Sequence, residues 1–249
     1  QVDEIIDSFK QKVELAKSNG KTIAGFFYEP IMGVRGSVPL PLEYMDGIAE
    51  ICKQNDILLI ADEITTGIGR AGKFFYSDSF SIKPDILCFG KAISAGHYPV
   101  AATLFNEKII NAWDTLEGQG IPFSQIHRRG NSITGTQEGC ALGLKVLEIL
   151  ERDNLIQQVN ERGKYALEKL QKIENYSNVR EIRGTGLLIG IDVVDSGFAK
   201  HTVTPEMRKR GINILPEGRV IMFNPAYIIS NDEIDNFVNN LSEVLKINE

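Results

Sequence analysis

The sequence predicts an α/β protein in which a mostly parallel sheet is followed by a smaller α+β domain. In the first part, short apolar runs separated partly by helical patterns occur at residues 22–29, 57–62, 85–90 and 100–105. Strands of a parallel sheet covered on both faces show such runs, because neither face is left polar. After residue 173 the pattern changes to short, glycine-interrupted strands. We therefore place the large domain at residues 1–150 and the small C-terminal domain at residues 151–249.

Helical periodicity places further elements between and after these strands. Residues 2–17 and 42–54 show the apolar spacing of amphipathic helices, and residues 136–173 form a longer helical stretch. The early part of that stretch carries one apolar stripe, made of Cys140, Leu142, Val146, Leu147 and Leu150. A stripe of this kind is typical of a helix that packs one face on a core.

The C-terminal part predicts a small α+β domain. Residues 179–194 hold two short strands, residues 198–211 a helix, and residues 212–225 a hairpin. The last helix follows, and we expect Asn231 or Asp232 as its N-cap. Short polar side chains at that position accept hydrogen bonds from the first free backbone N–H groups.

Composition and charge narrow the class of protein. The 249 residues are 43% apolar, enough for a sizeable core, and the formal net charge is −6. A chain with interspersed charges and this balance lacks the basic surface that neutralises nucleic-acid phosphates. No apolar run approaches the length of a membrane span, and no secretion signal is recognisable. We expect a cytoplasmic protein without nucleic-acid or membrane partners.

The three cysteines are far apart, and each lies in an apolar stretch. They are Cys52, Cys88 and Cys140. An odd number of distant cysteines favours reduced thiols in the core over disulfides. We expect no metal site.

Two charged residues follow directly on predicted strands. Asp62 ends the strand at 57–62, and Lys91 follows the strand at 85–90 between glycine and alanine. In open α/β sheets, ligands bind outside the carboxyl ends of the strands, where the loops diverge. A carboxylate there needs a cation or several donors to stay ionised. For Asp62 alone, the simplest interpretation is a loop cap or a pair with Arg70.

Lys91 changes that interpretation. A partly desolvated lysine is nucleophilic towards carbonyl compounds, as Schiff-base chemistry requires. An aspartate and a lysine on neighbouring strand ends suit pyridoxal phosphate. The lysine bonds to its aldehyde, while Asp62 keeps the pyridine nitrogen protonated so that the ring accepts electrons. Ile64 offers a stiff, β-branched side chain that can pack on a face of the ring.

The residues around this pair resemble one known family. The segments "LLIADEITTGIGRAG" and "KPDILCFGKAISAG" closely resemble the class III (ω-amino acid family) aminotransferases, which are pyridoxal-phosphate enzymes of fold-type I. Residues 27–39, 129–150 and 211–235 resemble other segments of the same family, so the similarity extends over nearly the whole chain. The resemblance implies the later part of a large cofactor-binding domain followed by a small C-terminal domain.

The resemblance also implies roles for residues near the strand ends. Lys91 would be the Schiff-base lysine and then the base that moves a proton between substrate and cofactor. Asp62 would bind the pyridine nitrogen, and Ile64 would lie beneath the ring. Thr65 stands where many members have a glutamine that contacts the phenolic oxygen of the cofactor. A threonine is shorter, so this contact would need a water.

Asn131 and Ser132 would reach the cofactor phosphate of a neighbouring subunit, because family members share their active sites across a homodimer. The implied reaction is transamination between an amine or ω-amino donor and a keto-acid or aldehyde acceptor. Racemisation, aminomutase chemistry and phospho-lyase chemistry start from the same cofactor linkage, and the sequence leaves them open. A noncatalytic subunit or fragment is a further alternative.

Three further positions depart from the family pattern. Met222 and Val34 replace the arginine that clamps the α-carboxylate of acceptors such as 2-oxoglutarate and the glutamate that pairs with it. Because the arginine and the glutamate are both absent, neither leaves an unpaired buried charge. We therefore expect that this chain does not use the dual-carboxylate binding mode, in which that arginine clamps the α-carboxylate of acceptors such as 2-oxoglutarate. Leu215 replaces an arginine that diaminopelargonate synthases use on their keto-acid substrate. Their specificity is therefore not expected here.

Family chains are much longer than 249 residues. Their first part supplies a Gly-Ser turn for the cofactor phosphate and an aromatic ring above the cofactor, and neither is found before Glu29. The chain also starts with Gln1, inside an expected helix, rather than with Met. We expect the ordered or excised part of a longer polypeptide. A split enzyme with a separate N-terminal chain and a remnant without catalysis remain alternatives.

Overall fold

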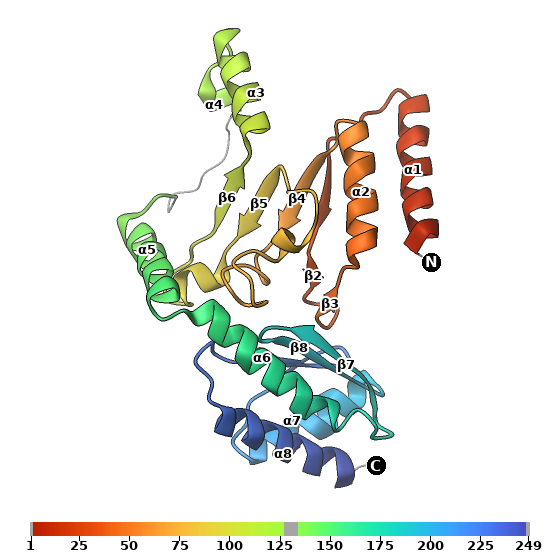
Figure 1. Cartoon of the computed structure of the whole chain (residues 1–249), viewed down its shortest axis with the longest axis vertical. Helices are drawn as coiled ribbons and strands as arrows, with labels where there is room; N and C mark the ends of the chain where they lie inside the picture. The colour runs from red at the N-terminus through yellow and green to blue at the C-terminus, as the bar shows by residue number, and fades with distance from the viewer. Residues whose placement is uncertain (1, 127–133, 248–249) are drawn as a thin grey trace. The chain divides into compact units, whose positions relative to one another are not determined.

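The computed structural model describes residues 2–126 and 134–247 (Figure 1). These residues form two compact units, each built from several segments of the chain. The first unit comprises the described residues up to Pro30, Leu40–Thr65 and Ser77–Glu148. The second unit comprises Ile31–Pro39, Thr66–Tyr76 and the described residues from Ile149 onward.

A four-stranded sheet forms the centre of the first unit, in the order β1-β4-β5-β6 (Figure 1). β1 (Gly25–Tyr28), β4 (Leu58–Asp62) and β5 (Ile86–Phe89) run parallel, and β6 (Ala102–Phe105) runs antiparallel to β5. The prediction of an α/β fold with a mostly parallel sheet is confirmed. The carboxyl ends of the three parallel strands share one edge of the sheet.

The helices α1 (Val2–Ser18) and α2 (Leu42–Gln54) pack against each other on one face of this sheet. The ring of Phe9 on α1 meets that of Phe26 on β1 edge to face, with 5.2 Å between centroids. The opposite face is less covered, because its residues on β4 and β5 are only half-buried. Phe27, which alternates with Phe26 on β1, is 60% exposed.

The next described helices after β6 are α3 (Glu107–Gly118), α4 (Phe123–Ile126) and α5 (Gln137–Arg152). Sequence periodicity did not reveal α3, although Asn106 caps it by accepting a hydrogen bond from the backbone N–H of Ile109.

The prediction of core thiols is correct for one cysteine and wrong for another. Cys52 on α2 is buried, Cys88 on β5 is half-buried, and all three thiols are free. Cys140 is exposed. It begins the predicted apolar stripe of α5, but its side chain lies outside the part of that stripe that packs inward.

An antiparallel sheet with the strand order β7-β8-β10-β9 forms the centre of the second unit. Its strands are β7 (Val179–Thr185), β8 (Leu188–Val193), β9 (Leu215–Glu217) and β10 (Val220–Phe223). A two-stranded hairpin is added, made of β2 (Ile31–Met32) and β3 (Val38–Pro39).

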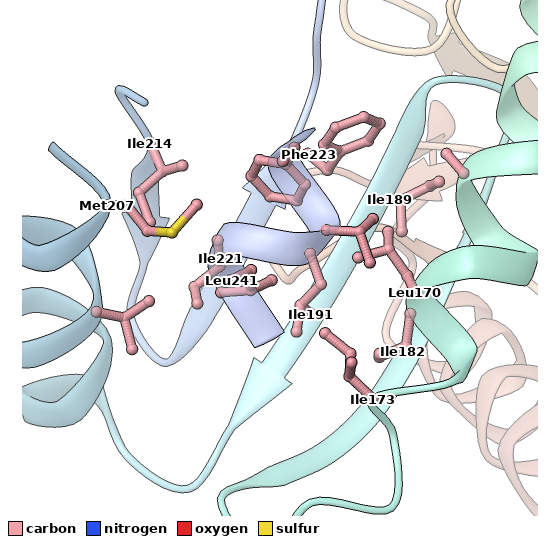
Figure 2. Close-up of a cluster of buried hydrophobic side chains, with 14 of the residues drawn as sticks. Leu170, Ile173, Ile182, Ile189, Ile191, Met207, Ile214, Ile221, Phe223 and Leu241 are labelled. Carbon is pink, nitrogen blue, oxygen red and sulfur yellow. The ribbon is translucent and has the colours of Figure 1, made fainter. Parts of the chain in front are cut away.

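The core of the second unit lies between this sheet and the helices α6 (Leu155–Gln171), α7 (Thr204–Lys209) and α8 (Asn231–Ile247). A short π-helical segment, Phe198–Val203, leads into α7. Figure 2 shows side chains of strands and helices meeting in this core, among them Ile189, Ile191, Leu170, Met207 and Leu241. On the other face of β8, Leu188 packs with Ile31 and Ala71. All six residues of β8 are therefore buried.

The N-cap of α8 differs from the prediction. Ser230, rather than Asn231 or Asp232, caps this helix, because its hydroxyl accepts a hydrogen bond from the backbone N–H of Glu233 at 3.2 Å. The Glu233 carboxylate accepts in return from the backbone N–H of Ser230 at 2.8 Å. This reciprocal pair is a capping box.

Within residues 2–126 and 134–247, no helix combines the length and the apolar character that a membrane crossing requires.

Candidate active site

Asp62 and Lys91 belong to neighbouring parallel strands of the first unit. Asp62 is the last residue of β4 and lies opposite Cys88 on β5. Lys91 follows Cys88 by three residues (91 − 88), beyond the carboxyl end of β5. The sheet therefore brings the two residues to the same edge, as the sequence predicts.

Two backbone hydrogen bonds hold the loop that follows Asp62. The backbone N–H of Ile64 donates to Oδ1 of Asp62 at 3.0 Å, and that of Glu63 donates to the carbonyl oxygen of Cys88 at 2.7 Å. Among the described residues, no donor forms a hydrogen bond to Oδ2 of the half-buried Asp62. The carboxylate thus keeps one oxygen for a ligand at the sheet edge.

The backbone at Lys91 has an uncommon conformation. Its φ of 45° lies in the left-handed region, which a residue with a Cβ rarely adopts and which surrounding structure has to stabilise. Gly90 precedes it, and a Cβ added there would lie 3.2 Å from Cδ1 of Ile64. The absence of a side chain at position 90 therefore allows the two strand ends to approach closely.

The Lys91 side chain contacts the loop after β4. Its ammonium group donates a hydrogen bond from Nζ to Oγ1 of Thr65 at 2.6 Å. Lys91 is solvent-exposed, so the amine is accessible to a ligand. Of the predicted residues, Asp62, Ile64, Thr65 and Lys91 are thus gathered on two neighbouring loops.

Ser94 was not identified from the sequence. Its side chain is buried, its hydroxyl donates to the carbonyl oxygen of Tyr98 at 2.6 Å, and it lies 3.4 Å from the carbonyl oxygen of Lys91. These contacts close the loop that begins at Lys91. A serine three residues after the lysine, in a run of small residues, is the signal that was available in the sequence.

The residue after Asp62, Glu63, is also an acid and lies beside the carboxyl ends of the parallel strands. Glu63 is fully buried and accepts a hydrogen bond from the backbone N–H of Ser77 at 2.6 Å. The hydroxyl of Tyr28, at the end of β1, is buried and has no hydrogen-bond partner among the described residues. Burial, and to a smaller extent the charge of Glu63, raises the pKa of Tyr28 far above its usual value. Both side chains are buried, so neither is exposed to a ligand at the sheet edge.

Arg70, the simplest candidate partner of Asp62, lies in the second unit and contacts backbone there. Its guanidinium donates to the carbonyl oxygens of Leu187 at 3.2 Å and Pro225 at 2.5 Å, and it lies 4.6 Å from the ring centroid of Tyr227. Burial lowers the pKa of Arg70. These contacts tie the segment 66–76 to the remainder of the second unit.

Asn131 and Ser132, the predicted phosphate contacts, lie outside the described residues. Val34, Leu215 and Met222, where the family pattern has charged residues, all lie in the second unit. Val34 is 72% exposed and Leu215 is 68% exposed, while Met222 is half-buried and packs against Ile31, Ala71 and Leu188. Met222 therefore fills its place with apolar contacts and leaves no buried charge there.

Comparison with known proteins extends this picture. Residues 2–245 match the profile of the family described as Aminotransferase class-III. The adenosylmethionine-8-amino-7-oxononanoate aminotransferase of Methanocaldococcus jannaschii is 34% identical over 230 residues, which are 87% of this chain and 49% of that protein. Gamma aminobutyrate transaminase 3 of Solanum lycopersicum is 33% identical over 245 residues, which are 94% of this chain and 46% of that protein.

Solved structures show the same similarity. An amine transaminase from an uncultivated Pseudomonas species, in its PLP-bound (internal aldimine) form, superposes with a TM-score of 0.89 at 32% identity. The match covers 99% of this chain and 56% of that one. The chain thus spans about half the length of the relatives that it matches. The match across residues 2–245, together with the strand-end pair Asp62 and Lys91, shows that the chain belongs to the class III aminotransferase family.

Proposed function

We propose that this chain carries the catalytic lysine of a pyridoxal-phosphate-dependent transamination between an amine or ω-amino donor and a keto-acid or aldehyde acceptor. One observation carries the proposal. Adjacent parallel strands place a carboxylate, Asp62, and an accessible amine, Lys91, at the same sheet edge. Ligands bind at such edges in open α/β sheets.

The residues at this edge fit pyridoxal phosphate. When bound, this cofactor supplies an aldehyde that condenses with amines and a protonated pyridine ring that accepts electrons from the reacting carbon. Lys91 offers the amine. Asp62 offers Oδ2, which accepts no hydrogen bond from the described residues. The apolar side chain of Ile64, close to Gly90, offers a surface for one face of the ring.

Each of these residues has a distinct task in the proposed site. Lys91 attaches the cofactor and, when its amine is free, takes and returns the proton at the reacting carbon. Asp62 keeps a proton on the pyridine nitrogen, because a carboxylate beside that nitrogen favours its charged form. Ile64 fixes the plane of the ring. We assign the phosphate contacts to Asn131 and Ser132.

The proposed acceptor substrates and the proposed oligomeric state are those of the family, except that one class of acceptor is left out. Because Val34, Met222 and Leu215 offer no charge for a substrate carboxylate, we propose acceptors that do not rely on the two-carboxylate mode of 2-oxoglutarate. We also propose a cytoplasmic homodimer with shared active sites.

Detection of the aminated cofactor tests the proposal. The purified chain is loaded with pyridoxal phosphate, an amine donor is added without an acceptor, and pyridoxamine phosphate is measured by chromatography. We expect it to form with the wild-type chain and not with Lys91→Ala, while Asp62→Asn lowers its rate of formation by at least about tenfold. A cofactor that stays in the aldehyde form while an amino-acid donor is racemised would contradict transamination.

A further inference from the structure

The contact between Lys91 and Thr65 differs from what the family pattern implies for position 65. That pattern gives this position a contact with the phenolic oxygen of the cofactor. In the structure, the Thr65 hydroxyl lies 2.6 Å from the Lys91 amine, a contact that the family pattern does not describe. A hydrogen bond from an ammonium group is charge-assisted and stronger than one between neutral groups.

The backbone fixes the position of the Thr65 hydroxyl. The loop that carries it is held at Asp62 by the N–H of Ile64 and at Cys88 by the N–H of Glu63. Threonine is also β-branched, so its χ1 angle has few alternatives. The acceptor is therefore placed independently of Lys91.

The backbone of Lys91 is fixed as well. Its left-handed φ and the hydrogen bond from Ser94 to Tyr98 set the direction in which the lysine side chain leaves the loop. The four-carbon stem of a lysine remains flexible beyond that point. Thr65 supplies the contact that its free amine needs in order to stay at the sheet edge.

We propose that Thr65 is a positioning residue for Lys91. Its hydroxyl accepts a hydrogen bond from the lysine ammonium whenever that amine is not bonded to the cofactor, and so holds the amine between the ends of β4 and β5. The inference rests on the proposed function for its catalytic meaning, because Lys91 acts as a base only while its amine is free. The contact itself exists without any cofactor.

Competitive acylation of the cofactor-free chain tests this contact directly. Wild type, Thr65→Val, Thr65→Ala and Thr65→Ser are labelled briefly with a trace of acetic anhydride at pH 8. The extent of labelling at Lys91 is then measured by mass spectrometry relative to Lys10, an exposed lysine on α1. The amine has to leave its contact with Thr65 before it reacts, so the hydrogen bond lowers the extent of labelling at Lys91.

Thr65→Val keeps the shape of the side chain and removes its hydroxyl. We expect it to raise the Lys91-to-Lys10 ratio by about two- to tenfold, the range that one hydrogen bond of ordinary net strength gives. Thr65→Ala should raise the ratio similarly, and Thr65→Ser should stay within about twofold of wild type. Thr103→Val, the same change on the exposed surface of β6, serves as the matched control and should leave the ratio unchanged.

An unchanged ratio in Thr65→Val and Thr65→Ala would overturn the inference, as would a rise in Thr65→Ser equal to that in Thr65→Val. Circular dichroism checks that each variant is folded. The outcome is separable from that of the proposed function, which is read from the formation of pyridoxamine phosphate. If the wild-type chain forms none, the proposed function fails while the labelling ratios still decide the role of Thr65.

Discussion

The two sheets of this chain are built from similar apolar strands but are buried very differently. β8 in the second unit is buried at all six positions, with helices against one face and Ile31 and Ala71 against the other. β4 in the first unit alternates between buried and half-buried positions, and Phe27 on the neighbouring β1 is 60% exposed. The candidate site lies in the unit with the less covered sheet.

The largest expected effect distinguishes the cores of the two sheets. Ile191→Ala on β8 removes a fully buried side chain that the surrounding helices cannot replace. We expect it to lower the free energy of unfolding by about 2–5 kcal/mol in urea titrations. The matched change Ile60→Ala on half-buried β4 should cost about 1 kcal/mol. Equal losses in the two variants would show that the sheets are not covered as differently as their exposure indicates.

A smaller effect is expected for the buried acid of the second unit. Asp192 on β8 is 4% exposed and accepts from Nε of Arg219 at 2.6 Å, with Nη1 of Arg183 at 3.4 Å. Asp192→Asn removes the carboxylate that pairs with Arg219 and leaves Arg183 with Glu181 alone, so we expect a loss of about 2 kcal/mol. Asp153→Asn, which removes an exposed pair with Arg152, should change stability by no more than about 0.5 kcal/mol. A loss for Asp192→Asn as small as this control would contradict the structural role of the pair.

The capping box of α8 offers a third comparison. Ser230→Ala removes the hydroxyl that accepts from the N–H of Glu233. We expect a loss of about 1 kcal/mol in chemical denaturation. Ser8→Ala, at an exposed position on α1, is the matched control, because alanine favours helix interiors and nothing is capped there. If both substitutions leave stability unchanged, Ser230 is not the energetically relevant cap.

The smallest effect concerns pH. The Lys169 ammonium, followed by the Tyr165 hydroxyl, lowers the pKa of Asp235 below its usual value. A lowered carboxyl pKa stabilises the folded chain above the unfolded-state pKa, and this contribution is lost as the pH falls through the folded-state pKa. Asp235→Asn should therefore lower the Tm at pH 7, and the difference from wild type should shrink towards pH 2.5. A Tm difference that is constant over this range, as we expect for the exposed Glu168→Gln, would contradict the assignment.

Lys169, the basic partner of Asp235, predicts a stability change at high pH instead of at low pH. The hydrogen bond to Asp235, followed by that to Tyr165, raises the pKa of Lys169 to about 12. Its contribution is complete below the ordinary lysine pKa and is lost as the pH rises through about 12. Lys169→Met should consequently lower the Tm at pH 8 and differ less from wild type as the pH approaches 12. An unchanged difference would exclude the pair as its cause.

Local sequence patterns predict the elements well where a single periodicity dominates. The helix at 42–54 and the strand that ends at Asp62 follow from apolar spacing, and both have the expected bounds within one residue. Ser230 followed by Glu233 is a local signal for a capping box, although Asn231 or Asp232 is the cap predicted from the sequence. The exposure of Cys140 could not be predicted, because its place in an apolar stripe does not show how far the packing partner extends.

In the candidate site, too, some features could be predicted from the sequence and others could not. The positions of Asp62 and Lys91 at strand ends could be predicted from the apolar runs before them. The contact of Lys91 with Thr65 joins residues 26 apart in sequence, and it depends on the strand register and on the left-handed backbone at Lys91. Neither feature has a signature in the sequence, since lysine rarely adopts that conformation. Such contacts become visible only in the folded chain.

The central claim is that Lys91 is the lysine that binds pyridoxal phosphate. Peptide mapping by mass spectrometry, after incubation with the cofactor and reduction with borohydride, tests it most directly. We predict a phosphopyridoxyl group on the peptide that contains Lys91, its loss in Lys91→Ala, and its retention in Lys83→Ala, which removes an exposed lysine on the amino-terminal side of β5. A chain labelled at other lysines but not at Lys91, or a Lys91→Ala variant labelled as fully as wild type, would contradict the claim.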